Sequence, residues 1–175
     1  MSFPLILASQ SPSRRMLMEN AGLVFETRPA AIDERAIEDA VAACQPEPPD
    51  IAAALAEAKA LDVARRFPEA IVIGSDQTLS LDSRIFHKPA DMAEAKSHLM
   101  AMSGRTHALN CGVVLAKDGE TLWRHVSIAR LTMRPLSEAF IDRYLARVGE
   151  RVLSSVGAYQ LEGEGVQLFE AIEGD

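Results

Sequence analysis

Apolar residues in this chain come in continuous runs that indicate buried strands. Residues 5–8 read Leu-Ile-Leu-Ala, and residues 70–73 read Ala-Ile-Val-Ile. Neither run shows the alternation of apolar and polar residues that is typical of a strand with one solvent-exposed face. Continuous runs of this length are typical of central strands that are covered on both faces. The pattern therefore predicts two buried strands of an α/β protein.

Helix signals lie between and after these runs. Ser11 suits an N-cap and Pro12 the first helical position, and Gly22 suits the end of the same helix. Residues 51–67 are rich in alanine, so helix propensity rather than periodicity predicts a helix there, with Asp50 as its N-cap. The predicted helices cover 12–21, 51–67, 92–102 and 138–148, and the predicted strands cover 24–27, 70–73, 78–81, 84–86, 108–116 and 121–133. The charged residues 32–35 and the glycine-rich residues 157–165 are expected to be loops.

The length and element order predict a mixed α/β fold. At 175 residues, the chain is long enough for a substantial core, so we expect a single domain over residues 1–175, or two lobes that share one sheet. Cys44 and Cys111 stand alone, without metal-ligand spacing, which favours reduced thiols. The four histidines show no ligand pattern either, and surface or satisfied core positions are expected for them.

Composition and charge narrow the class of protein. Apolar residues make up 48% and charged residues 25% of the chain, and the formal net charge is −7. No run approaches the length of a membrane span, and the N-terminus lacks a signal-peptide pattern, so we predict a cytoplasmic protein. The acidic balance argues against binding to nucleic acid or to an anionic membrane. A small anionic substrate would need a local cationic pocket.

Arg14 and Arg15 point to such a pocket. They fall in the first turn of the helix predicted after the strand at residues 5–8. The helix dipole disfavours cations there by roughly 0.3–1 kcal/mol each, whereas an anion is favoured by free N–H groups and guanidinium forks. A phosphate chain is the predicted ligand. The open alternative is a surface helix whose arginines pair with nearby carboxylates.

Asp76 is the main candidate for chemistry. It follows the buried run 70–73 within Gly-Ser-Asp-Gln, and ligands of α/β sheets bind at the carboxyl ends of such strands. With Glu34 as a second carboxylate and Lys59 and Lys88 as further cations, the set suits metal-assisted cleavage of a phosphoanhydride. Each residue alone also suits a solvated surface. The patterns GxxxxGK[ST], GxGxxG, GxSxG and HExxH are absent.

Several short motifs, taken in order, resemble one family. They are LILASQSPSRR at residues 5–15, the Asp33-Glu34 pair, AEAKA at 56–60, VIGSDQ at 72–77, HKP at 87–89, SGRTH at 103–107 and GAYQLEGEG at 157–165. Together they resemble the Maf family of nucleoside triphosphate pyrophosphatases over nearly the whole chain. The resemblance implies an elongated mixed sheet flanked by helices, with two lobes around a cleft, as in the inosine triphosphatase type. The implied reaction is metal-dependent hydrolysis of a nucleoside triphosphate to the monophosphate and pyrophosphate.

The resemblance also implies roles for individual residues. Ser9, Arg14 and Arg15 look like the phosphate-binding block, with Lys59 and Lys88 as further phosphate ligands. Asp76 matches the proton acceptor for the attacking water. The residues implied as catalytic are Asp76, Lys88 and Glu34, those implied for substrate are Ser9, Arg14, Arg15, Lys59, Gln77 and Gln160, and those implied for Mg²⁺ or Mn²⁺ are Glu34 and Asp76.

The motifs differ in the nucleotide base that they indicate for the substrate. Gln77 resembles the branch that acts on 7-methyl-GTP, whereas SGRTH and GAYQ look more like the branch that acts on dTTP and UTP. We expect 7-methyl-GTP or another modified nucleotide, with dTTP/UTP hydrolysis as the alternative. A non-catalytic regulator of septum formation is a further alternative, and a homodimer is expected from the resemblance alone. The family usually continues beyond Gly174-Asp175, so we expect a C-terminal segment to be missing here.

Overall fold

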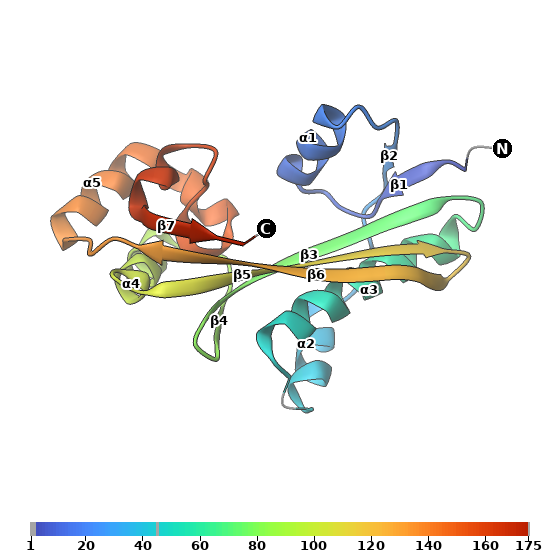
Figure 1. Cartoon of the computed structure of the whole chain (residues 1–175), viewed down its shortest axis with the longest axis horizontal. Coiled ribbons are helices and arrows are strands. Elements are labelled where there is room, and N and C mark those ends of the chain that lie inside the picture. Colours follow the sequence, from blue (N-terminus) through green and yellow to red (C-terminus); the bar gives the residue numbers. More distant parts are fainter. Residues whose placement is uncertain (1–2, 45, 175) are drawn as a thin grey trace. The chain divides into compact units, whose positions relative to one another are not determined.

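The computed structural model describes residues 3–44 and 46–174 (Figure 1). Its α-helices are α1 (Pro12–Asn20), α2 (Glu34–Ala42), α3 (Pro48–Arg66), α4 (Met92–Met102) and α5 (Glu138–Val148). Its strands are β1 (Leu5–Leu7), β2 (Glu26–Thr27), β3 (Ile71–Leu81), β4 (Arg84–Phe86), β5 (Thr106–Lys117), β6 (Glu120–Met133) and β7 (Phe169–Glu173). Three short 3₁₀ segments, η1 (Gly149–Ser154), η2 (Val156–Ala158) and η3 (Glu164–Leu168), lie between α5 and β7.

The strands form one mixed sheet in the order β2-β1-β3-β5-β6-β7, with β4 paired to β3. β1 is parallel to both β2 and β3, whereas β4 is antiparallel to β3 and β7 is antiparallel to β6. The predicted mixed α/β fold, with a sheet flanked by helices, is therefore confirmed. None of the helices in the described part of the chain is both long and apolar enough to cross a membrane.

The chain divides into two compact units. The first contains the residues up to Gln77 together with Cys111–Ser127, and the second contains Thr78–Asn110 and the residues from Ile128 onward. The long strands β3, β5 and β6 contribute a segment to each unit, so the division follows packing rather than the order of the chain.

The core of the first unit depends on a close approach of α3 to the sheet. The buried face of α3 carries alanines, among them Ala52, Ala56 and Ala60. A Cβ added at Gly74 of β3 would overlap the carbonyl oxygen of Ala56 and lie 2.7 Å from the Ala60 Cβ. Because neither partner has bulk at this contact, helix and strand pack almost backbone to backbone.

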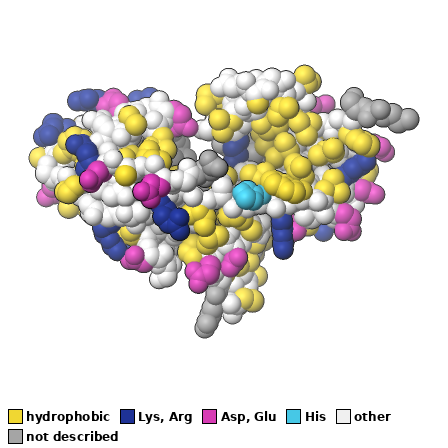
Figure 2. All heavy atoms as spheres, viewed as in Figure 1, with side chains coloured by type: hydrophobic (Ala, Val, Ile, Leu, Met, Phe, Trp, Pro, Cys, Tyr) yellow, Lys and Arg dark blue, Asp and Glu magenta, His cyan; other side chains and the backbone are white. Residues whose placement is uncertain are grey.

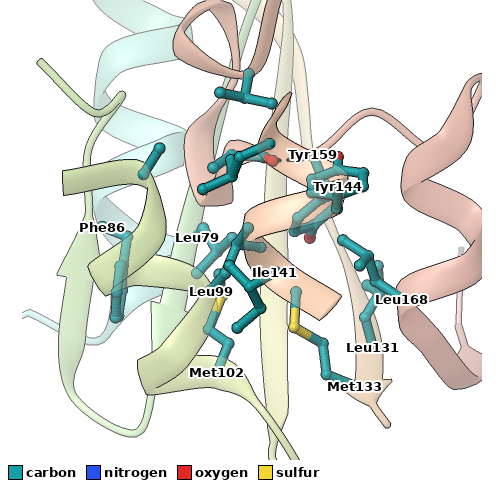
Figure 3. Packing of buried hydrophobic residues seen from close by; sticks show 14 of the residues in the cluster. Leu79, Phe86, Leu99, Met102, Leu131, Met133, Ile141, Tyr144, Tyr159 and Leu168 are labelled. Carbon is teal, nitrogen blue, oxygen red and sulfur yellow. Dashed lines mark hydrogen bonds between the residues drawn. The ribbon is translucent and has the colours of Figure 1, made fainter. Parts of the chain in front are cut away.

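The second unit has a larger apolar core. Its buried members come from β3, β4, α4, β6, α5 and the 3₁₀ segments. Figure 3 shows Leu79, Leu99 and Ile141 of this cluster converging from three of these elements. On the first unit, by contrast, apolar side chains reach the surface (Figure 2). Leu17 of α1 is exposed, as are Leu23 and Val24 in the segment between α1 and β2.

Several predicted elements need correction. β3 runs unbroken over Ile71–Leu81, so the two strands predicted at 70–73 and 78–81 are parts of one strand, which begins at Ile71. The charged segment after Asp33 is helix α2 and not a loop, because Asp33 caps it by accepting from the N–H of Ala36 at 3.0 Å. Asp50 is not the N-cap of α3 but its third residue, where Oδ2 accepts from the N–H of Glu47.

Candidate active site

The turn between β1 and α1 is organised around the hydroxyl of Ser9, which is buried. Its Oγ accepts hydrogen bonds from the N–H of Ser11 at 3.1 Å and from Nη1 of Arg14 at 3.3 Å. Ser11 caps the helix as predicted, with Oγ accepting from the N–H of Arg14 at 3.4 Å. The Arg14 guanidinium is thus folded back over the turn, beside the start of the helix, where an anion is favoured.

Arg15 points elsewhere. Its Nε donates to Glu19 Oε1 at 2.7 Å, and both side chains are more than half exposed. Arg15 therefore forms the kind of surface pair that the open alternative describes, whereas Arg14 contacts Ser9 at the start of the helix. The assignment of both arginines to substrate stays a prediction.

Lys59, Asp76 and Glu34 meet in the first unit although they come from α3, β3 and α2. Nζ of Lys59 lies 2.5 Å from Asp76 Oδ1 and 3.0 Å from Glu34 Oε1. The side chains of Lys59 and Asp76 are only 12% and 11% exposed, whereas that of Glu34 is 54% exposed. One ammonium therefore links a buried carboxylate to a carboxylate that can still reach solvent.

Local structure explains why these three groups meet. The close contact at Gly74 brings α3 down onto β3, so Lys59 can reach a side chain two residues further along the strand. The pairing of β1 with β3 ends at Ile73, whose carbonyl accepts from the N–H of Ala8 at 2.8 Å. Asp76 therefore lies inside its strand, contrary to prediction, but beyond the carboxyl end of the parallel pair. This is where ligands of α/β sheets bind.

The carboxylate pair can be tested as a cation site. Glu34 and Asp76 both contact Lys59 Nζ, and their oxygens are the donors that Mg²⁺ prefers. Within residues 3–44 and 46–174, no group of three or more His, Cys, Asp and Glu side chains is placed to hold a metal. Mg²⁺ commonly binds through one or two carboxylates plus substrate phosphates and water. The two-carboxylate set fits a cation that is completed by a phosphorylated ligand.

The remaining predicted residues lie outside this cluster. Gln77 follows Asp76 in β3, so its side chain alternates to the other face and is exposed. Lys88 and Gln160 belong to the second unit. Lys88 is exposed after β4, and Gln160 is exposed after η2, where its Nε2 donates to Ser154 Oγ at 3.1 Å.

Two histidines differ from the expectation of surface or satisfied core positions. His98 and His107 are buried, and the Nδ1 atom of each has no hydrogen-bond partner among the described residues. Burial lowers the pKa of both, that of His107 to about 4. Nε2 of His107 lies 2.7 Å from the hydroxyl of Tyr159. No spacing in the sequence signals a contact between residues so far apart.

Together, a strand–turn–helix that presents Arg14 and a lysine bridging two carboxylates define an α/β protein suited to binding a phosphorylated ligand. The family model described as Maf-like protein matches residues 4–175. The chain belongs to this family, and the resemblance seen in its motifs is confirmed.

Curated relatives are similar over nearly the whole chain. The chain is 66% identical to the 7-methyl-GTP pyrophosphatase of Rhizobium etli over 171 residues, which cover 98% of this chain and 86% of that protein. It is 59% identical to the 7-methyl-GTP pyrophosphatase of Brucella suis, over 100% of this chain and 88% of that protein. It is 51% identical to the nucleoside triphosphate pyrophosphatase of Rhodopseudomonas palustris, over 99% of this chain and 85% of that protein.

Proposed function

We propose that this protein hydrolyses a nucleoside triphosphate to the monophosphate and pyrophosphate, and that 7-methyl-GTP is its substrate. The observation that carries the proposal is the cluster in which Lys59 links Glu34 to buried Asp76. The chain that contains this cluster is 66% identical to the 7-methyl-GTP pyrophosphatase of Rhizobium etli. The reaction class is the one predicted from the sequence, and the relatives support it.

The β1–α1 turn is assigned to the phosphates. Ser9 and Arg14 already form one hydrogen-bonded unit, so the guanidinium is oriented before a ligand arrives. Orientation in advance reduces the side-chain entropy that binding would otherwise cost. Arg15 would join them by exchanging Glu19 for a phosphate oxygen, a stronger acceptor for a guanidinium.

Asp76 is assigned as the proton acceptor for the attacking water. Oδ1 is engaged by Lys59, so Oδ2 would take the proton. Lys59 would hold the carboxylate in place and offer its remaining N–H donors to a phosphate oxygen. A divalent cation, Mg²⁺ or Mn²⁺, held by Glu34 and Asp76 would supply charge neutralisation at the triphosphate. Lys88, Gln77 and Gln160 remain predictions as substrate contacts.

A product-resolved assay tests the proposal. Purified protein is incubated with Mg²⁺ or Mn²⁺ and with 7-methyl-GTP, dTTP, UTP or the four canonical nucleotides, and pyrophosphate is separated from orthophosphate. We expect pyrophosphate and 7-methyl-GMP, and no turnover in EDTA until the cation is restored. Orthophosphate alone, or no product from any nucleotide, would refute the assignment. Preference for dTTP and UTP would retain the reaction and overturn the base.

Asp76→Asn separates catalysis from binding. The amide keeps the shape of the carboxylate but cannot accept the proton, so turnover should fall by at least about 100-fold, the lower range for general-base catalysis. Binding of 7-methyl-GTP, measured by calorimetry in Ca²⁺, should change much less. A matched control is Asp142→Asn, which removes a surface carboxylate paired with Lys96 in the second unit and should leave turnover unchanged.

A further inference from the structure

Two motifs of the sequence, SGRTH and GAYQ, meet in the core of the second unit. His107 lies on β5 and Tyr159 directly follows η2, and both are buried. Nε2 of His107 and the Tyr159 hydroxyl lie 2.7 Å apart, within hydrogen-bond distance. The ring of Phe169 packs against both, with centroids 4.8 Å from Tyr159 and 5.9 Å from His107. The assigned chemistry uses none of these three side chains.

The backbone around Tyr159 is held in an unusual conformation. Gly157 and Ala158 have φ angles of 78° and 59°, both in the left-handed region. A Cβ added at Gly157 would lie 2.7 Å from the Tyr159 ring. Two hydrogen bonds hold the segment further: Tyr144 donates to the Ala158 carbonyl at 3.3 Å, and Ser155 donates to the Tyr159 carbonyl at 2.7 Å. Figure 3 places Tyr144 and Tyr159 in the same cluster.

The next residue, Gln160, is the predicted substrate contact of this unit. A Cβ added at Gly165 would lie within 2.4 Å of the Gln160 carbonyl oxygen, so this peptide is tightly packed. The Gln160 amide is exposed, and its Nε2 donates to Ser154. The segment therefore presents one polar side chain from a firmly anchored peptide, and the anchor on the core side is Tyr159.

The hydrogen bond between Tyr159 and His107 is the polar part of this anchor. Nδ1 of His107 has no partner among the described residues, so Nε2 is the ring atom with a hydrogen bond. Removing the tyrosine hydroxyl would leave a buried imidazole with neither nitrogen paired. Buried polar groups are costly when they are unpaired, so the core would relax around β5 and η2.

We propose that His107 and Tyr159 form a positioning pair that holds Gln160 in the direction needed to contact the nucleotide. The pair acts through Gln160 and touches no substrate itself, so its residues are positioning residues. The inference rests on the proposed function, in which Gln160 binds the substrate.

The test begins with Tyr159→Phe, which removes one hydroxyl and leaves the ring. KM for 7-methyl-GTP should rise by about tenfold, the lower end of what the loss of an orienting partner costs around metal ligands, with a smaller change in kcat. His107→Phe should do the same. His107→Gln, whose amide can replace Nε2, should restore most of the loss. Ile141→Val is the matched control, because it loosens the same core without changing a hydrogen bond, and its KM should stay at the wild-type value.

A double-mutant cycle decides whether the pair acts through Gln160. In a Gln160→Ala background, Tyr159→Phe should have no further effect on KM. The proposal is overturned if Tyr159→Phe leaves KM unchanged, or if it raises KM equally with and without Gln160.

Hydrogen exchange separates this inference from the proposed function. In the protein without nucleotide, Tyr159→Phe should increase amide exchange over residues 158–165, and Ile141→Val should not. If the wild-type protein turns over no nucleotide, the proposed function fails while this readout still reports whether the pair anchors Gln160. Unchanged exchange would overturn the inference even in an active enzyme.

Discussion

Replacing Lys59 by methionine should destabilise the first unit because it leaves Asp76 buried without its ammonium partner. Methionine keeps the length and apolar stem of lysine, so packing against α3 changes little. The Lys59 and Asp76 side chains are 12% and 11% exposed, so water can replace little of the lost interaction.

The size of the effect follows from the burial of each carboxylate. Removing one partner of a buried ion pair costs about 3–5 kcal/mol, and slight exposure of this pair favours the lower end. Glu34 is 54% exposed, so Glu34→Gln should cost less than about 1 kcal/mol. Adding Asp76→Asn to Lys59→Met removes the unpaired charge and should recover most of the loss, because a neutral pair can match a buried ion pair.

Trp123 provides the assay. It is the chain's single tryptophan and lies in the first unit, so its fluorescence during urea unfolding reports on that unit. We expect Lys59→Met to lose the most stability, with the double variant between it and the wild type. If the free energy of unfolding of Lys59→Met were within about 0.5 kcal/mol of the wild-type value, the ion pair would not contribute the stability expected of a buried pair. That result would refute this reasoning.

Two further predictions concern packing and pH. Gly74→Ala should lower the free energy of unfolding by about 1–3 kcal/mol and reduce turnover, because the new methyl group displaces α3 at Ala56 and moves Lys59 away from Asp76. Trp123 fluorescence measures the stability and the pyrophosphate assay measures the turnover. Unchanged turnover would contradict the link between this packing contact and the position of Lys59. Burial lowers the pKa of His107 from 6.5 to about 4, so the unfolded chain binds the proton first and stability is lost as pH falls through this window. By about pH 4.5 this histidine should account for about 2–3 kcal/mol of the stability lost since pH 7. In urea unfolding, the His107→Gln variant should therefore lose about 2–3 kcal/mol less than the wild type between pH 7 and pH 4.5. Equal losses in the two proteins would contradict this prediction.

Elements with strong local signals were predicted correctly. Met92–Met102 and Glu138–Val148 are helices as expected, and Asp91 and Ser137 cap them through their side chains. The predicted strands 108–116 and 121–133 correspond to β5 and β6, and Asp118 and Gly119, with φ angles of 51° and 76°, form the turn between them. Caps and tight turns are decided by residues close together in the chain, and that is why sequence alone reveals them.

Elements that depend on distant packing were predicted less well. The Gly-Ser-Asp-Gln segment contains a glycine and polar residues that usually end a strand, yet β3 continues through it. Partners elsewhere stabilise the extended backbone: Gly74 packs under α3, and Asp76 pairs with Lys59. Neighbouring elements also decide which face of α4 is covered, so Met102 is buried whereas Met100 is 45% exposed.

The sequence by itself determined the elements with strong local signals, the family and the kinds of residue at the site. It identified Ser9 and Arg14 at the start of a helix because their relation is local. Only the tertiary structure decided that Lys59 bridges Glu34 and Asp76 and that His107 meets Tyr159. These contacts join residues from separate elements, so they depend on how helices and strands pack together rather than on any local pattern.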